Sequence, residues 1–125
     1  MRLLDTDILV DVRRGFIPAL RWYSSLAEVA NLPGYVYLEL MDGCVNKREL
    51  KRMQTFLAAN PVVWCTDAEC ALAVDYFARY KLSHNLGVMD SLIAACAVGR
   101  SATLCTFNAK HFQVIPGLTL EQALC

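Results

Sequence analysis

The chain has 125 residues and a mass of 13.9 kDa, the size of one compact domain, so a single hydrophobic core over residues 1–125 is expected. Hydrophobic residues make up 56% of the chain, which excludes disorder as the main state, and the longest apolar run, residues 92–99, is far shorter than the ~18 residues of a transmembrane helix. Twelve basic and twelve acidic side chains cancel, so any binding of nucleic acid must rest on a local patch of charge.

The start of the chain and its cysteines indicate a cytoplasmic protein. Asp5 and Asp7 interrupt the apolar region that a signal peptide needs, so neither export nor membrane attachment is expected. The six cysteines form no C-x-x-C pair and several lie in apolar runs, which favours reduced thiols over disulfides or zinc ligands. They are Cys44, Cys65, Cys70, Cys96, Cys105 and Cys125.

In the first half of the chain, apolar runs and turn residues predict a strand followed by helices. Residues 2–5 predict a short buried strand, and residues 7–14 a helix that a glycine ends. A second helix is predicted over residues 18–30, with an apolar face formed by Leu20, Tyr23, Leu26 and Ala27. Residues 35–38 fit a strand, although a helix beginning at Tyr37 fits equally well.

The second half of the chain repeats the order of strand and helix. Further helices are predicted over residues 47–60, 68–82 and 90–98, and further strands over residues 61–65 and 102–106. The first of these helices is amphipathic with a basic face, Asp67 is expected to cap the second, and Asp90 or Ser91 the third. Residues 108–112 are expected to form a turn or a short helix.

The alternation of strands and helices predicts an α/β fold. We expect three layers, α/β/α, with a mainly parallel central sheet flanked by helices on both faces. In such folds the ligand sites lie at the carboxyl ends of the strands. Residues that follow the predicted strands are therefore the first candidates for a functional site.

Three acidic residues and one asparagine lie within or beside apolar segments. Asp5 ends the first strand, Glu39 lies between two leucines, Asp90 begins the most apolar helix, and Asn108 follows the strand at residues 102–106. Each has an ordinary structural explanation: a helix N-cap for the two aspartates, an exposed helix position for Glu39, and a turn for Asn108. A parallel sheet would nevertheless gather these positions at one edge, where an unpaired buried carboxylate is costly.

Convergence of the three carboxylates would require a cation. Carboxylates a few Å apart raise one another's pKa, so they stay ionised at neutral pH only beside a positive charge. Oxygen ligands without histidine or thiolate favour Mg²⁺ or Mn²⁺ over Zn²⁺. Because such ions activate water and stabilise the leaving oxygen in phosphodiester hydrolysis, the pattern predicts a metal-dependent nuclease.

The same segments resemble PIN-domain ribonucleases, and most of all the VapC-type toxins of bacterial toxin–antitoxin pairs. The resemblance runs nearly end to end and is carried by the order and spacing of LLDTDILVD (3–11), LELMDG (38–43), GVMDSLIAACAV (87–98), LCTFNAKHF (104–112) and IPGL (115–118). It implies that Asp5, Glu39 and Asp90 are the metal-binding carboxylates. It further implies endonucleolytic cleavage of RNA, a homodimer, and inhibition by a small cognate antitoxin whose tail covers the active site.

The resemblance also assigns expectations to three neighbouring residues. The fourth acidic position of many PIN domains is Asn108 here, which leaves the number of metal ions, one or two, open. Asn108 is expected to orient water or to bind metal through its amide oxygen. Thr6 is expected to position Asp5, and Asp7 occupies a variable place in the first motif.

Basic side chains are candidate contacts for RNA phosphates. Arg13 and Arg14 follow the first motif, and four more stand one turn apart on the predicted helix 47–60: Lys47, Arg48, Lys51 and Arg52. A solvated helix face also explains these four, and cations in the last turn of a helix also suit its dipole. His84 and His111 are interpreted as loop or packing residues, because they lack the spacing of a metal-binding pair.

Two other interpretations fit part of the pattern. A phospho-receiver domain has a similar length, α/β order and Mg²⁺ requirement, and Asp5 with Asp7 resembles its acidic pair. Asp67 and Lys110, however, do not fall at the strand ends that a receiver needs. A catalytically inactive PIN-like binding module would explain Asn108, although all three carboxylates are retained.

Overall fold

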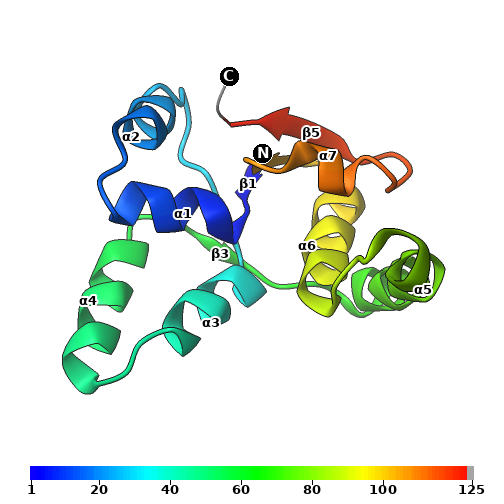
Figure 1. Ribbon diagram of the computed structural model, residues 1–125, viewed down its shortest axis with the longest axis horizontal. Helices are drawn as coiled ribbons and strands as arrows, with labels where there is room; N and C mark the ends of the chain where they lie inside the picture. The colour runs from blue at the N-terminus through cyan, green and yellow to red at the C-terminus, as the bar shows by residue number, and fades with distance from the viewer. Residues whose placement is uncertain (124–125) are drawn as a thin grey trace.

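The computed structural model describes residues 1–123, in which short strands alternate with helices (Figure 1). The strands are β1 (Arg2–Leu4), β2 (Leu32–Pro33), β3 (Val62–Val63), β4 (Thr103–Thr106) and β5 (Thr119–Gln122). The helices are α1 (Thr6–Arg13), α2 (Ile17–Ser24), α3 (Gly34–Asp42), α4 (Lys47–Leu57), α5 (Asp67–His84), α6 (Val88–Gly99) and α7 (Ala109–Phe112). No helix within this part of the chain is long and apolar enough to cross a membrane.

Every strand pairing is parallel. β4 lies between β1 and β5, β2 pairs with β3, and a bridge between Leu3 and Asn31 joins the two groups in the order β3-β2-β1-β4-β5. Helices α1, α2 and α4 lie to one side of the strands and α5 and α6 to the other (Figure 1). The predicted three-layer fold with a mainly parallel sheet is confirmed, but β5 is an additional strand that the apolar pattern did not reveal.

The two central strands form the middle of the core. Leu3, Leu4, Leu104 and Cys105 are all fully buried, as expected for strands covered by helices on both faces. The five cysteines in residues 1–123 carry free thiols, whereas Cys125 lies outside the described residues. The buried β1–β4 pair therefore fixes the positions of the residues that follow the carboxyl ends of these strands.

The second predicted helix is wrong in its length and only partly right in its apolar face, because Tyr23 and Leu26 pack against the core but the other two residues do not. α2 ends at Ser24, and residues 25–31 turn back so that the Asn31 N–H donates to the Arg2 carbonyl at 2.9 Å. Pairing with β1 requires extended backbone, which overrides the helical pattern over residues 26–30. Leu20 and Ala27, predicted to be buried, are exposed, and the buried side chain is that of Ala19.

The segment after β2 is helical rather than extended. The predicted strand at residues 35–38 lies inside α3, which begins at Gly34, three residues before the alternative start at Tyr37. Pro33 ends β2 and directly precedes α3, so the strand in this region is limited to residues 32–33. A Cβ at Gly34 would overlap the ring of Trp64, which shows how closely the start of α3 approaches the chain after β3.

Two helix caps also differ from the prediction. α5 is capped by Thr66 rather than Asp67, because Thr66 and Glu69 form a reciprocal capping box. α6 begins at Val88 after Gly87, so neither Asp90 nor Ser91 is the N-cap. Asp90 instead lies in the first turn of α6, which leaves its side chain available for other contacts.

The amphipathic helix predicted at residues 47–60 is confirmed as α4, although it ends three residues earlier. Met53 and Leu57 are buried on its apolar side, while the four predicted basic side chains are exposed on the other. Asn46 caps this helix by accepting from the Glu49 N–H at 2.9 Å. The basic face is therefore presented by a well-defined helix.

Gly99→Ala is expected to destabilise the protein, although alanine favours helices over glycine by about 1 kcal/mol. The new Cβ would overlap Oε2 and Cγ of Glu69, which is itself buried and held in the capping box of α5. Because α5 and α6 pack closely here, we expect the free energy of unfolding, measured in urea, to fall by about 1–3 kcal/mol. The matched control is Gly43→Ala at the end of α3, where the nearest atom to a new Cβ is the Leu40 carbonyl oxygen at 3.6 Å. The control should be neutral or stabilising, and equal losses in both variants would contradict this packing.

Candidate active site

Asp5 lies at the carboxyl end of β1, where it has both a capping role and a place in a buried acidic cluster. Its N–H donates to the Cys105 carbonyl at 2.9 Å, which continues the pairing of β1 with β4. Its Oδ1 accepts from the Thr6 N–H at 2.8 Å as the N-cap of α1, as predicted. Its Oδ2 accepts from the Thr106 hydroxyl at the end of β4, at 2.9 Å. The carboxylate is consequently only 9% exposed.

Asp7 is more central than its variable place in the first motif suggested. Its Oδ2 accepts from the Phe107 N–H at 3.1 Å and lies 3.2 Å from the same Thr106 hydroxyl that contacts Asp5. Its Oδ1 is buried and has no hydrogen-bond partner within residues 1–123. A buried carboxylate oxygen without a donor is rare in proteins, so this atom marks a position where a ligand would be expected.

Asp90 reaches the same edge of the sheet from the first turn of α6. Its Oδ2 lies 2.9 Å from Nε2 of His111 on α7, and its charge contributes to the raised pKa of Asp5. His111 also packs edge-on against the Phe112 ring, so the packing prediction was incomplete. The sequence signal that could have predicted the contact of His111 with Asp90 is the position of His111 on α7, the element that follows β4.

Glu39 enters from α3 and is exposed, in agreement with the ordinary structural interpretation of that position. Its Oε1 accepts a hydrogen bond from the Thr6 hydroxyl. Thr6 therefore contacts Asp5 through its backbone N–H and Glu39 through its side chain, so it connects the two carboxylates. The predicted role of Thr6 in positioning Asp5 is thus carried by the backbone, while its hydroxyl holds Glu39.

Asn108 lies at the start of α7 and is exposed. It takes part in the network through its backbone N–H, which donates to Thr106 Oγ1 at 3.0 Å. The contact that links it to the aspartates thus does not involve the side-chain amide. We refer to Asp5, Asp7, Glu39 and Asp90 together as the carboxylate site.

Burial without a positive partner makes the positions of Asp5 and Asp7 electrostatically unfavourable. Burial, with the charge of Asp7 next and a smaller contribution from Asp90, raises the pKa of Asp5 to about 6, although the hydrogen bonds from Thr106 and the Thr6 N–H oppose this. Burial likewise raises the pKa of Asp7. Within residues 1–123 neither Asp5 nor Asp7 forms an ion pair, so a bound cation would relieve both.

A groove of about 590 Å³ connects the carboxylate site to basic side chains. Thr6 and Glu39 line this groove together with Arg13, Arg14 and Arg52. A second hollow of about 380 Å³ shares Arg52 and is also lined by Arg48, Lys51 and Thr55. Lys47 lines neither hollow. Five of the six predicted basic residues are thus arranged in a continuous region that begins beside Glu39.

Comparison with known proteins identifies the family. Residues 2–118 match the PIN domain. The chain is 35% identical over 124 residues to ribonuclease VapC19 of Mycobacterium tuberculosis, covering 94% of this chain and 97% of that protein. Ribonuclease VapC10 of the same organism is 33% identical over 121 residues, covering 94% of this chain and 90% of that protein.

A solved structure has the same fold. A chain in the crystal structure of VapBC2 from Rickettsia felis, bound to a DNA fragment from their promoter, matches with a TM-score of 0.78 and 25% identity over 96% of each chain. The sequence match and the fold match therefore agree over nearly the whole length. The chain belongs to the PIN-domain family and is of the VapC type.

Proposed function

We propose that this protein is a metal-dependent endoribonuclease that hydrolyses RNA phosphodiester bonds, and that it is the toxin of a toxin–antitoxin pair. The observation that carries the proposal is the convergence of Asp5 and Asp7 on the Thr106 hydroxyl at the carboxyl edge of β1 and β4, with the charge of Asp90 acting on Asp5 and a buried Asp7 oxygen left unpartnered. The relatives named as ribonucleases support the reaction. The position at the ends of parallel strands supports a substrate site.

Mg²⁺ or Mn²⁺ is the cofactor that suits this group of side chains. The donors are carboxylate oxygens, which these hard ions prefer, and Asp5, Glu39 and Asp90 are the proposed ligands. The raised pKa of Asp5 is a feature that a divalent cation would relieve, and the unpartnered Oδ1 makes Asp7 a further candidate ligand. When bound, such an ion lowers the pKa of water and stabilises charge on phosphate oxygens. Because Asn108 stands where many PIN domains have a fourth acidic residue, a site with one ion and a site with two ions are both alternatives.

The chain's own residues would orient the ligands and the RNA. Thr106 holds Asp5 and Asp7 through one hydroxyl, and His111 holds Asp90. Thr6 holds Glu39 at the border of the groove. Arg13, Arg14 and the basic face of α4 would bind phosphates of the RNA strand, which places the backbone along the groove.

The partner proposals rest on the family. A solved relative is a VapBC complex, which supports a small cognate antitoxin as the protein partner of this chain. We further propose a homodimer acting in the cytoplasm. The phospho-receiver interpretation is not supported, because the PIN match covers residues 2–118 and Asp67 begins α5 instead of ending a strand. The cleavage test below decides between this function and the inactive binding module.

Asp90→Asn and Glu39→Gln should each lower the rate of RNA cleavage in Mg²⁺ or Mn²⁺ by about 100-fold or more, equivalent to ~2.7 kcal/mol of transition-state stabilisation. Both changes keep the side-chain shape and the contacts to His111 and Thr6, so circular dichroism should show an unchanged fold. Asp42→Asn, exposed on α3 like Glu39, is the matched control and should cleave normally. A wild-type chain that cleaves no RNA and binds no divalent ion would support the inactive binding module instead.

Asp5→Asn should remove a pH dependence of stability that exists only without metal. The carboxyl has a pKa of about 6 in the folded protein and an ordinary value of 3.8, so the folded state holds its proton to higher pH. In chelator the wild-type free energy of unfolding therefore falls as pH rises through this interval, by about 1–3 kcal/mol relative to the variant. Urea unfolding between pH 4 and pH 7 measures this difference, and saturating Mg²⁺ should abolish it. A variant less stable than wild type at pH 7 in chelator would contradict an uncompensated charge at Asp5.

Arg52→Gln should weaken RNA binding and reduce its salt dependence. Arg52 lines both hollows, so loss of one phosphate contact should lower the slope of log affinity against log salt by about 1. The measurement is fluorescence anisotropy with labelled RNA, using Asp90→Asn protein to prevent cleavage. Arg79→Gln is the control, because Arg79 is exposed on α5 and pairs with Asp75. An unchanged slope for Arg52→Gln would indicate that the basic face of α4 is in contact with solvent and does not bind RNA.

A further inference from the structure

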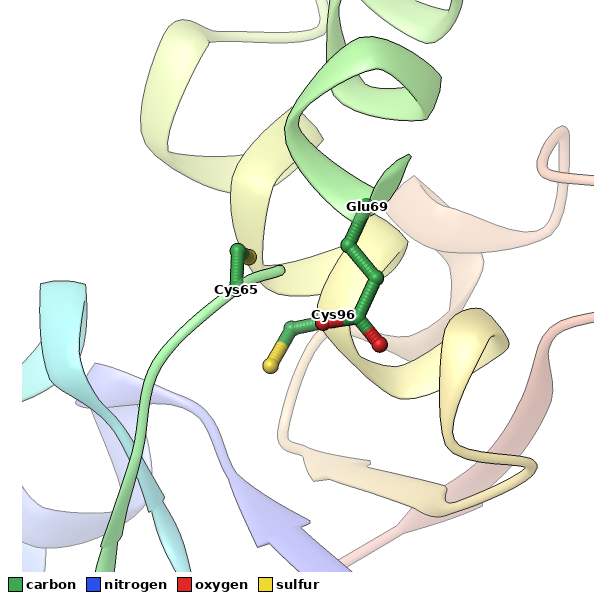
Figure 2. A group of neighbouring side chains, drawn as sticks. All are labelled: Cys65, Glu69 and Cys96. Carbon is green, nitrogen blue, oxygen red and sulfur yellow. The ribbon is translucent and has the colours of Figure 1, made fainter. Parts of the chain in front are cut away.

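A second group of metal-binding atoms lies between α5 and α6, outside the carboxylate site. Cys65 precedes α5, Glu69 lies in the first turn of α5, and Cys96 lies on α6 (Figure 2). One donor atom from each residue lies within 4.8 Å of the other two. We call these three residues the cysteine–glutamate cluster. Cys96 follows Asp90 by six residues on α6, about 9 Å along the helix axis.

We propose that the cysteine–glutamate cluster is a binding site for a thiophilic divalent ion, with Zn²⁺ as the expected occupant. Two thiolates and one carboxylate are ligands typical of zinc, and three protein ligands leave a fourth position for water. The proposal does not depend on the ribonuclease function. It concerns different ligands and a different class of ion from the carboxylate site.

The geometry is close to that of a bound ion. Zinc lies about 2.3 Å from each sulfur in tetrahedral sites, which places two sulfurs ~3.8 Å apart, so donor atoms within 4.8 Å need to move by about 1 Å at most. Cys96 is fully buried and Glu69 is 6% exposed, whereas Cys65 is half-buried. The cluster is thus shielded from solvent and reachable from the side of Cys65.

Arg100 completes the charge balance of the cluster. Its Nε lies 3.4 Å from Cys96 Sγ, and a terminal guanidinium nitrogen lies 3.3 Å from Glu69 Oε1. Three negative ligand charges would be neutralised by the two charges of the ion and the one of Arg100. Arg100 also donates to the Trp64 carbonyl, next to Cys65, so one side chain contacts all three segments that carry ligands. Partners of this kind orient metal ligands in known sites.

The carboxylate of the cluster is fixed before any ion binds. Glu69 Oε1 accepts from the Thr66 N–H at 2.9 Å in the capping box, and its other oxygen faces the bare backbone of Gly99. Cys65 Sγ lies 3.4 Å from the Leu92 carbonyl oxygen, to which a thiol can donate. Because the thiolate is the form that binds metal, an ion displaces the thiol proton on binding.

The test uses Co²⁺ as an optical probe for the zinc position. The full chain is reduced, stripped with chelator and titrated with Co²⁺ in excess Mg²⁺, which occupies oxygen-only sites. We expect one equivalent of Co²⁺ to give a near-ultraviolet thiolate-to-cobalt absorption band, which Zn²⁺ then removes. Calorimetry in buffers of different ionisation enthalpy should report proton release on binding.

Three variants and two controls assign the ligands. Cys65→Ser and Cys96→Ser should lose the band, and Glu69→Gln, which can keep the capping box, should weaken Co²⁺ binding by about 10-fold or more. Cys44→Ser is the matched control, because Cys44 is half-buried and its thiol also donates to a backbone carbonyl. Asp90→Asn should bind Co²⁺ normally, which separates this site from the carboxylate site.

Several outcomes would overturn the proposal. A folded wild-type chain without the absorption band excludes thiolate coordination, and a band that survives in Cys65→Ser assigns the cobalt elsewhere. Recovery of a Cys65–Cys96 disulfide in place of metal binding would make the pair a redox couple instead. If the buried Cys96→Ser variant does not fold, the half-buried Cys65→Ser variant and Glu69→Gln still decide the result.

Discussion

The candidate active site depends on the burial of negative charge where β1 and β4 end. Asp5 and Asp7 are separated from Thr106 by about a hundred residues of sequence, yet both approach its hydroxyl because the two strands run parallel and in register. Hydrophobic packing of the central strands favours this arrangement strongly enough to hold two carboxylates in a place that neither would occupy alone. The sheet therefore positions the two carboxylates. Their unfavourable electrostatic energy favours the binding of a cation at this edge.

The surrounding helices contribute to this edge of the sheet through their N-terminal ends. α1, α6 and α7 all begin near this edge, so their N-terminal backbone groups and first-turn side chains face one region. α3 and α4 extend the region outward, from Glu39 to the exposed basic face that shares a groove with it. The groove beside Glu39 is lined by Arg13, Arg14 and Arg52, which suits a strand of phosphates approaching a cation.

Local sequence patterns predicted the parallel fold and the capping position of Asp5, and they singled out Asp90, whose charge acts on Asp5. They failed where a tertiary contact decided the outcome: Asn31 pairs with β1 and so shortens α2, and the Thr66–Glu69 capping box displaces Asp67 from the cap. The central place of Asp7 and the contact of His111 with Asp90 also escaped prediction, because the first depends on Thr106 and Phe107 at the end of β4 and the second on the position of α7. The cysteine–glutamate cluster has no sequence motif, since its ligands meet only when α5 packs on α6.

The hydroxyl of Thr106 has a further consequence, because it carries a single hydrogen. It must be shared between Asp5 and Asp7, and the shorter distance, 2.9 Å against 3.2 Å, favours Asp5. The two aspartates are thus unequal even though they converge on the same atom. Asp7 depends mainly on the backbone donor from Phe107 for one oxygen and has no donor for the other within residues 1–123, so the two carboxylates at this edge differ in how fully they are hydrogen-bonded.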